Sequence, residues 1–228
     1  MNIYEKPSHT NIKAIEKNFR TFILEKKHPC LMAKSVFKAD NYHLKTYAEM
    51  NSSQTAKLLL EDLENYIVQY DFESNHFESF IAVFPNDSFE DEITFEKNLW
   101  HLLQLLHDHD DCAWDPAVSD DPNDSNFSFS IKGEAFYIIG LHPKSSRLAR
   151  QSLHPTLVFN LHWQFEHLRE MGSYSKVKKK IRKRDKKRQG SINPVLKDFG
   201  KDSETKQYSG RAVEKDWKCP FHTKSQLV

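Results

Sequence analysis

The chain has 228 residues, of which 38% are hydrophobic and 12% aromatic, so it can bury one large core. No apolar run approaches the roughly 20 residues that a membrane-spanning helix needs, and the three cysteines lie too far apart for a disulfide framework. A helical membrane protein and a disulfide-stapled secreted domain are therefore excluded. The N-terminal residues lack the apolar segment of a signal peptide, and we expect a cytoplasmic protein.

The net charge of +1 hides an uneven distribution of charge along the chain. Residues 176–188, KVKKKIRKRDKKR, contain ten lysines and arginines and one aspartate. The rest of the protein has 23 basic and 31 acidic residues, a balance of −8. A basic segment on an acidic body attracts anions locally, such as phosphate, carboxylate or nucleic acid.

Hydrophobic spacing predicts the elements of the first half of the chain. The expected helices cover residues 10–27, 52–71 and 87–109, and the expected strands cover 30–37 and 77–84. The second helix has Ser52 or Ser53 as its cap, and Ser88 and Asp91 have capping-box spacing at the start of the third. The strand at 30–37 is predicted from a short apolar run that follows a proline.

A β-hairpin is the clearest element of the second half. FSFSI (127–131) alternates with a period of two, KGE is a turn, and AFYIIGL (135–141) is a fuller apolar run. TLVFN (156–160) adds a further strand. With the two earlier strands this gives a mainly antiparallel sheet of about five strands with helices on at least one face, and the fold class is α+β.

Apolar periodicity stops after Ser173. We therefore expect a single domain over residues 1–228, with its core at about 10–173 and a basic, irregular C-terminal segment at about 174–228. Such a segment either wraps the core, which is the arrangement we expect, or stays mobile.

Residues 107–125, HDHDDCAWDPAVSDDPNDS, hold two histidines, a cysteine and seven aspartates. The candidate ligands for a divalent metal at the start of this segment are His107, Asp108, His109, Asp110 and Asp111. Their spacing matches neither an EF-hand nor a zinc signature. A solvated polar loop at the end of a helix is the interpretation that we favour from the residues alone.

Two other segments are candidates for binding anions. HPKSSRLARQSLHP (142–155) places Ser145, Ser146, Arg147 and Arg150 around an expected helix start, where backbone N–H groups and guanidinium groups can hold an anion. The alternative is a loop with surface arginines, and the residues do not decide between the two.

The basic segment 176–188 lacks the interleaved aromatic residues of single-strand binders and any nucleic-acid-binding motif. This argues against a nucleic-acid site. The alternatives are a charged solvated face, or a segment that grips carboxylates or phosphates of a ligand through Arg182 and Arg184. We interpret it as a ligand-binding or chain-packing feature.

FNLHWQFEHLRE (159–170) predicts a short helix with Asn160 as its cap and Gly172 as its end. The stripe of Leu161, Phe165 and Leu168 faces the core, which places His162 at the edge of the core and His167 outward. From spacing alone, a single histidine at the edge of a core is more often structural than a ligand.

The order of several short motifs changes that interpretation. The motifs include LWHLLQLLHD, FSFSIKGEAFYIIGLHPKSSRLAR, LVFNLHWQFEHLRE, IRKRD, GSINPVLKDFG, QYSGR and WKCPF. In sequence and order, from about residue 30 to residue 221, they resemble the bacterial YqcI/YcgG family. Similar members are haem-dependent oxygenases that N-hydroxylate guanidino amino acids. The resemblance implies a haem b protein that uses O₂ and an electron donor to oxidise a guanidino or amino nitrogen.

The resemblance also gives roles to particular residues. The candidate axial ligands to the haem iron, in order of preference, are His162, His142 and Cys219. His162 ranks first because an axial ligand needs a rigid position, and a helix directly after a strand provides one. The candidates for pairing with the haem propionates are Arg147, Arg150, Arg182 and Arg184. The candidates for holding the cationic substrate are Trp114, Asp115, Asp120 and Asp121.

A second class of function stays open at this point. The chain could be a non-catalytic haem-binding carrier or sensor, or an anion- or nucleic-acid-binding module that uses residues 176–188. A haem absorption spectrum and turnover of a guanidine separate these alternatives.

Overall fold

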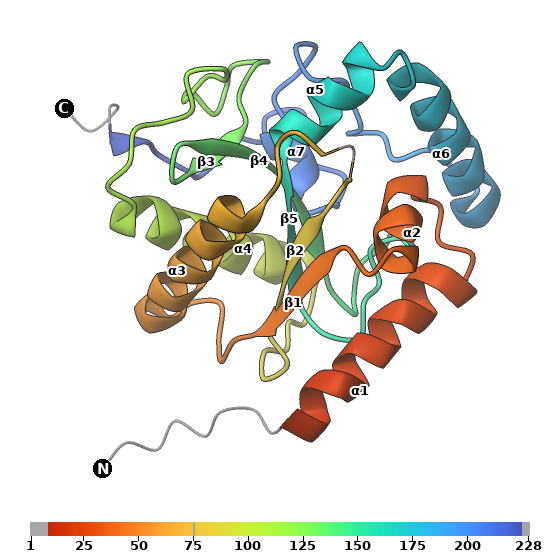
Figure 1. Ribbon diagram of the computed structural model, residues 1–228, viewed down its shortest axis with the longest axis horizontal. Helices are drawn as coiled ribbons and strands as arrows, with labels where there is room; N and C mark the ends of the chain where they lie inside the picture. The colour runs from red at the N-terminus through yellow and green to blue at the C-terminus, as the bar shows by residue number, and fades with distance from the viewer. Residues whose placement is uncertain (1–8, 75, 225–228) are drawn as a thin grey trace.

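The computed structural model describes residues 9–74 and 76–224, which form three layers with a β-sheet in the middle (Figure 1). The strand order is β1-β2-β5-β4-β3, with β1 parallel to β2 and the other neighbours antiparallel. The strands are β1 (Tyr42–Thr46), β2 (Ser79–Val83), β3 (Phe129–Ile131), β4 (Glu134–Leu141) and β5 (Thr156–Leu161). The predicted single α+β domain with a mainly antiparallel sheet is confirmed.

The predicted hairpin is present as β3 and β4. The two strands are joined by Lys132 and Gly133, whose φ angles are +52° and +81°. Positive φ at both central positions is the geometry of the two-residue turn that matches the twist of a hairpin. Glycine at the second position adopts it without steric cost.

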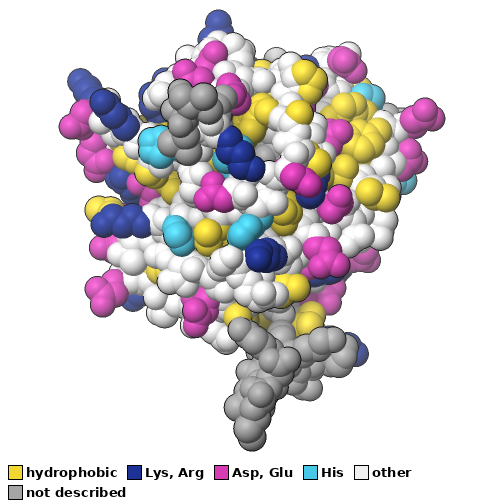
Figure 2. Space-filling model, turned by 90° about the vertical axis from the view of Figure 1, so that its left-hand side faces the viewer, with side chains coloured by type: hydrophobic (Ala, Val, Ile, Leu, Met, Phe, Trp, Pro, Cys, Tyr) yellow, Lys and Arg dark blue, Asp and Glu magenta, His cyan; other side chains and the backbone are white. Residues whose placement is uncertain are grey.

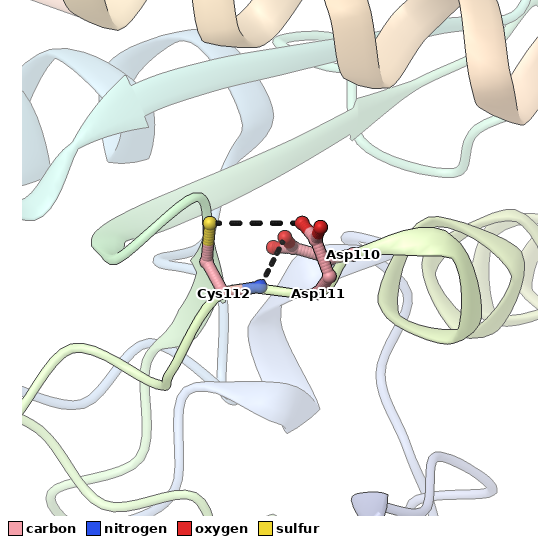
Figure 3. Close-up of side chains that lie close together, drawn as sticks. All are labelled: Asp110, Asp111 and Cys112. Atoms are coloured by element: carbon pink, nitrogen blue, oxygen red, sulfur yellow. Dashed lines mark hydrogen bonds between the residues drawn. The ribbon is translucent and has the colours of Figure 1, made fainter.

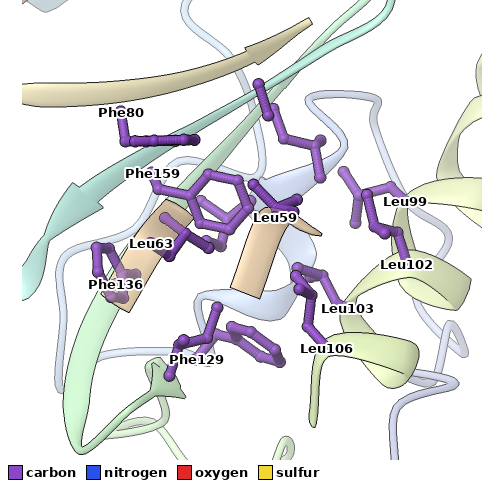
Figure 4. Packing of buried hydrophobic residues seen from close by; sticks show 14 of the residues in the cluster. Leu59, Leu63, Phe80, Leu99, Leu102, Leu103, Leu106, Phe129, Phe136 and Phe159 are labelled. Carbon is purple, nitrogen blue, oxygen red and sulfur yellow. The ribbon is translucent and has the colours of Figure 1, made fainter. Parts of the chain in front are cut away.

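Two long helices, α3 (Ser53–Gln69) and α4 (Glu92–His109), cover one face of the sheet (Figure 1). Ser52 and Asp91 cap them, because their side chains accept hydrogen bonds from the backbone N–H groups of Thr55 and Thr94. The leucines of both helices meet phenylalanines of the strands in the largest core of the protein (Figure 4). Outside, acidic, basic and histidine side chains are mixed over this face of the molecule (Figure 2).

The opposite face of the sheet carries α1 (His9–Arg20), which continues as the π-helix η1 (Thr21–Glu25), and then α2 (Leu31–Lys38). A second, smaller apolar cluster lies here, built from Ile15, Phe19, Phe22, Ile23, Val36, Phe37, Ile81, Val83 and Leu141. Successive residues of a strand point to opposite faces, so β2 supplies Phe80 to one cluster and Ile81 to the other.

The strand predicted at residues 30–37 is wrong, because this segment is helix α2. The sulfur of Cys30 accepts the N–H of Ala33 and caps the helix. A short apolar run does not distinguish a strand from a buried helix, and the preceding proline was compatible with both. The missing strand is β1, whose half-polar sequence YHLKT gives no apolar signal. The helix start expected near Arg147 is also wrong, because Arg147 lies in a bend and residues 148–150 form a turn.

Three further helices follow β5: α5 (His162–Glu170), α6 (Tyr174–Gln189) and α7 (Thr205–Tyr208). The predicted helix after TLVFN is confirmed as α5, but Asn160 is not its cap. The Asn160 side chain instead accepts a hydrogen bond from Ser79 Oγ at 2.7 Å. The basic segment forms α6, which was not predicted because a helix without a buried residue has no apolar period.

The chain after α6 wraps the core, as expected. Arg211 forms a buried ion pair with Glu96 of α4 at 2.9 Å, and Trp217 donates to the same carboxylate at 3.0 Å. Phe221 is 1% exposed and lies against Trp114 and Phe129 in the α3/α4 core. Within the described residues, no helix is long and apolar enough to cross a membrane.

Candidate functional site

A cavity of about 320 Å³ lies on the face of the sheet that carries α1 and α2. Its floor is formed by side chains of β2, β4 and β5, namely Ser79, Ile81, Tyr137, Ile139, Leu141, Val158 and Asn160. Its walls come from α1, η1, α2, α5, α6 and the segment 193–207. Segments from the whole length of the chain therefore meet around one space, whose lining is mainly apolar with a few buried polar groups.

His162, the first residue of α5, lines this cavity and is 6% exposed. Its Nδ1 lies 3.3 Å from Ser128 Oγ, and its Nε2 lies 2.9 Å from a carboxylate oxygen of Glu166, one turn along the helix. Burial and, to a smaller extent, the nearby charge of Arg169 lower the pKa of His162 to about 4. The imidazole is therefore neutral at pH 7, the form in which histidine binds metal ions.

His28 and Cys30 also line the cavity, and sequence reasoning did not single them out. Burial lowers the pKa of His28 to about 4. Its Nε2 lies 3.0 Å from the Ala149 carbonyl oxygen and its Nδ1 accepts the N–H of Cys30 at 3.3 Å, so both nitrogens are used by the backbone. Burial raises the pKa of the Cys30 thiol, although the N–H groups of α2 oppose this.

Three of the four predicted arginines line the cavity. Arg147 pairs with Asp185 of α6 at 2.5 Å. Arg150 donates to the carbonyl oxygens of Gly140 and Gln207 at 2.9 and 3.2 Å. Both arginines therefore connect separate segments of the chain around the site.

Arg182 and Arg184 lie on α6 but differ in position. Arg182 lines the cavity and contacts Asp198 at 3.4 Å, while its buried Nε has no partner among the described residues. Arg184 is not part of the described lining, and it donates to the backbone carbonyl oxygens of His28 and Pro29 at 2.8 and 3.1 Å. The inner side of the basic helix thus holds neighbouring segments in place.

The other two candidate axial ligands lie away from the described lining of the cavity. His142 is fully buried and stacks on Phe95 with ring centroids 4.3 Å apart, and neither ring nitrogen has a hydrogen-bond partner among the described residues. Cys219 packs against the α3/α4 core, and burial raises the pKa of its thiol to about 12. Of the three candidates, the structure brings only His162 to the cavity wall in the described part of the chain.

The residues predicted to hold a cationic substrate do not belong to the described cavity lining. Trp114 packs against Phe127 and Phe129 and donates Nε1–H to the Ser119 carbonyl oxygen at 3.1 Å. Asp115 accepts the N–H groups of Ala117 and Ala135 at 2.8 and 2.9 Å, and its charge raises the pKa of His162 slightly against the effect of burial.

The neighbouring aspartates lie in the same loop. Asp121 accepts the backbone N–H of Asn123 at 2.9 Å, and Asp120 precedes it. Asp115 and Asp121 each accept the backbone N–H group of the residue two positions later, and hydrogen bonds of this type stabilise a turn. The structure therefore places the aspartate loop over the main core, where these two carboxylates fold the loop onto itself.

Three side chains of this region, Asp110, Asp111 and Cys112, have potential metal-ligand atoms within 4.8 Å of one another (Figure 3). Asp110 accepts the N–H groups of Cys112 and Lys132 at 3.0 and 2.7 Å. The Lys132 ammonium lies 3.1 Å from Asp111 and supplies the cation that these carboxylates need. Asp110, Asp111 and Cys112 thus form a turn that is stabilised by side-chain hydrogen bonds directly after α4.

The two histidines of the same segment are engaged elsewhere. His109 Nε2 lies 2.8 Å from Ser53 Oγ, and His107 Nε2 accepts the N–H of Lys224 at 3.0 Å. Both nitrogens therefore serve to join other segments to the end of α4. Residues 107–111 are thus a polar helix end, as favoured from the sequence, but they are not solvated throughout, because His107 and Asp110 are buried.

Glu204, just before α7, is the residue of the cavity that sequence reasoning missed most clearly. It is 4% exposed, and burial raises its pKa to about 8. Its Oε2 accepts hydrogen bonds from Ser128 Oγ at 3.1 Å and Tyr208 Oη at 3.3 Å. Ser128 thus links Glu204 to His162 through hydrogen bonds. No local pattern marks Glu204, because it precedes a four-residue helix in an irregular segment.

Comparisons with known proteins complete the description of the site. The model of the YqcI/YcgG family matches residues 19–222, which include every segment that lines the cavity. The uncharacterized protein YqcI of Bacillus subtilis (strain 168) is 27% identical over 207 residues, which cover 86% of this chain and 81% of the relative. No solved structure is significantly similar. Because the family match spans most of its length, this chain belongs to the YqcI/YcgG family.

Proposed function

We propose that the protein is a haem-dependent monooxygenase that uses O₂ to hydroxylate a guanidino or amino nitrogen of an arginine-like substrate. Membership of the YqcI/YcgG family supports this proposal through the resemblance described above. The observation that carries it is the neutral imidazole of His162 on the wall of a largely apolar cavity of about 320 Å³.

The residues around the cavity fit the chemical needs of haem. A haem requires apolar walls for its macrocycle, a nitrogen or sulfur donor for its iron, and cations for its two propionates. The strands supply Ile81, Ile139 and Val158 as an apolar floor, and the cations Arg147 and Arg182 line the same space. The volume lies within the range of about 300–1,000 Å³ that is usual for ligand sites.

His162 is the group in this lining that is best suited to hold the iron. Its Nδ1 can keep the hydrogen bond to Ser128, which orients the ring as outer partners of metal-bound histidines do. Its Nε2 would then exchange the bond to Glu166 for the metal. Glu166 is half-exposed and also pairs with Arg169, so its carboxylate stays satisfied after the exchange. His28 is a poorer ligand because the backbone uses both of its nitrogens.

Bound haem supplies the activation of O₂, and the protein supplies orientation, charge and the exclusion of water. The Arg147–Asp185 pair connects α6 to the loop after β4, so it holds one wall of the cavity in place. Arg150 bonds to backbone carbonyl oxygens of β4 and α7 and holds a second wall. Both contacts are buried or partly buried, which makes the shape of the cavity well defined.

The absorption spectrum of the purified protein, supplied with haemin where needed, tests the cofactor. We expect a Soret band that is lost or shifted in His162→Ala and restored by added imidazole. His167→Ala is the matched control, because His167 lies on the same helix and stacks on Trp163 with ring planes 7° apart. His142→Ala and Cys219→Ser should keep the wild-type spectrum. A wild-type spectrum in His162→Ala would contradict the ligand assignment, and the absence of haem binding would contradict the proposed function.

Turnover separates an enzyme from a carrier or sensor. With haem, O₂ and a reductant, arginine or a related guanidine should give a product that is about 16 mass units heavier, through gain of one oxygen atom. Reaction in ¹⁸O₂ identifies the source of that atom. A haem-loaded protein that oxidises no guanidine or amine would be a carrier or sensor.

A further inference from the structure

We propose that Glu204 is the group that binds the cationic nitrogen of the substrate inside the cavity. This inference rests on the proposed function and replaces the aspartate loop at residues 115–121 as the place where a guanidinium is recognised. It concerns a residue that neither the sequence motifs nor the family resemblance marked.

The geometry of Glu204 leaves one carboxylate oxygen available to a ligand. Ser128 and Tyr208 both donate to Oε2, and within the described residues no hydrogen bond reaches Oε1. The side chain is 4% exposed overall and still lines the cavity. Two hydroxyl groups thus fix the carboxyl group through Oε2. Its other oxygen, Oε1, can accept a hydrogen bond from a ligand in the cavity.

Comparison with the other buried carboxyl groups shows what Glu204 lacks. Among the described residues three carboxyl side chains are buried: Glu96, Asp110 and Glu204. Glu96 pairs with Arg211 at 2.9 Å, and the ammonium of Lys132 lies 3.8 Å from Asp110. Glu204 forms no ion pair within the described part of the chain. A buried carboxylate needs a cation or enough hydrogen bonds to offset its desolvation, so Glu204 lacks the partner that a cationic ligand would provide.

Burial accordingly raises the pKa of Glu204 to about 8. Without a ligand the group is therefore mainly a neutral acid at pH 7. When a guanidinium enters the cavity, Glu204 releases its proton to solvent, and the resulting carboxylate forms an ion pair with the guanidinium. Glutamine therefore resembles the neutral Glu204 of the ligand-free protein in shape and charge, but it cannot form this ion pair.

Neighbouring groups favour a planar cation with several N–H donors. Tyr137 Oη donates to Gln207 Oε1 at 3.1 Å, and both residues line the cavity with Glu204. Their oxygen atoms add acceptors to the carboxylate, and a guanidinium carries up to five N–H donors. Arg169 lines the same space, and because its partner Glu166 is half-exposed, the guanidinium can also meet a carboxylate on the same ligand. This combination describes an amino acid with a guanidinium side chain.

The test is direct binding of arginine to the full-length protein, measured by calorimetry with and without haemin and independent of turnover. We expect Glu204→Gln to bind arginine at least about tenfold more weakly, because it loses a charge-assisted hydrogen bond through Oε1. Citrulline, the neutral analogue of arginine, should bind the variant and the wild type almost equally. The folded state should be retained, since glutamine replaces a group that is already neutral at pH 7.

Two variants serve as controls. Asp198→Asn changes a carboxylate that lines the same cavity but is already paired with Lys178 at 2.7 Å, and Asp121→Asn changes the loop that the sequence favoured. Both should bind arginine like the wild type. Unchanged binding in Glu204→Gln, or a loss in Asp121→Asn instead, would overturn the assignment while leaving the proposed function in place. A wild-type protein that binds neither arginine nor any other guanidine would overturn both.

Discussion

The two faces of the sheet are built from alternate residues of the same strands, and yet they are packed differently. On the α3/α4 face, Phe80, Phe136 and Phe159 are at most 1% exposed and pack against leucines (Figure 4). On the other face, Ile139 and Val158 line a cavity. One face is filled by packed side chains, whereas the other leaves a mainly apolar space with a few charged and polar groups around it.

From this difference we infer that stability comes mainly from the filled face and propose that the cavity face binds a ligand. Filling a core maximises buried apolar area, while a binding site must leave apolar area uncovered until its ligand arrives. On the cavity face, contacts such as Arg150 to Gly140 and Arg147 to Asp185 hold the walls together with a smaller apolar cluster. We therefore expect substitutions on the two faces to have different consequences, as the following predictions specify.

The largest effect is expected on the filled face. Phe159→Ala should lower the free energy of unfolding by about 3–5 kcal/mol, because it leaves a cavity between packed rings. Val158→Ala, the next residue in the chain but on the cavity face, should cost only about 1 kcal/mol, because less apolar contact is lost. Urea denaturation of both variants measures the contrast. Equal losses would show that the two faces contribute equally to stability.

Acid should weaken the cavity face through His28. Its pKa is about 4 in the folded protein and 6.5 in the unfolded chain, so the unfolded chain binds more protons between these values. Its contribution to stability is thus complete above pH 6.5 and is lost as the pH falls toward 4, by up to about 3 kcal/mol. His28→Asn should flatten this part of the curve of unfolding free energy against pH. A curve with an unchanged slope between pH 6.5 and 4 would contradict the prediction.

A smaller effect is expected where the filled face meets the C-terminal segment. A Cβ at Gly140 would lie 2.8 Å from side-chain atoms of Leu99 and Phe95 and 2.9 Å from the Tyr208 carbonyl oxygen. Gly140→Ala should therefore cost about 1–3 kcal/mol through overpacking. Combining it with Leu99→Ala should cost less than the sum of the two single changes, because the smaller side chain makes room. Additive losses of unfolding free energy would show that a clash with Leu99 is not the cause of the destabilisation by Gly140→Ala.

The smallest effect is expected at the rim of the cavity. Lys178→Met removes one partner of Asp198, an ion pair whose side chains are 27% and 34% exposed. Pairs of this kind contribute about 0–1 kcal/mol, so the melting temperature should change little and less still at high salt. A loss as large as that of Phe159→Ala would show that the rim, and not the core, limits stability.

Sequence patterns predicted the filled face better than the cavity face. The cap of α3, the alternation in β3 and the turn at Lys132–Gly133 are local signals, and each was recognised. The helix α4 was predicted too, but its cap is Asp91, and the capping box that was expected to begin at Ser88 is wrong. The segment 30–37 was assigned to the wrong class because eight apolar-rich residues carry no decisive period. The helical state of α6 was missed because its contacts are polar and tertiary.

The candidate site was only partly accessible to sequence reasoning. His162 was ranked first because of its place after a strand and its motif, and it does line the cavity. His28, Cys30 and Glu204 come from segments that are distant in sequence and meet only in the folded chain. Without a local pattern, nothing in the sequence groups a residue at position 28 with one at position 204.

The position of Phe221 has a consequence for the synthesis of the protein. Its ring contacts Phe129 and Trp100, with centroids 5.3 and 6.4 Å apart, inside the core that α3 and α4 build some hundred residues earlier. A ribosome that has translated α6 therefore carries a chain whose main core still lacks an aromatic ring. Folding of this layer is completed only after residue 221 leaves the exit tunnel, so the nascent protein exposes apolar surface to chaperones until that residue has emerged.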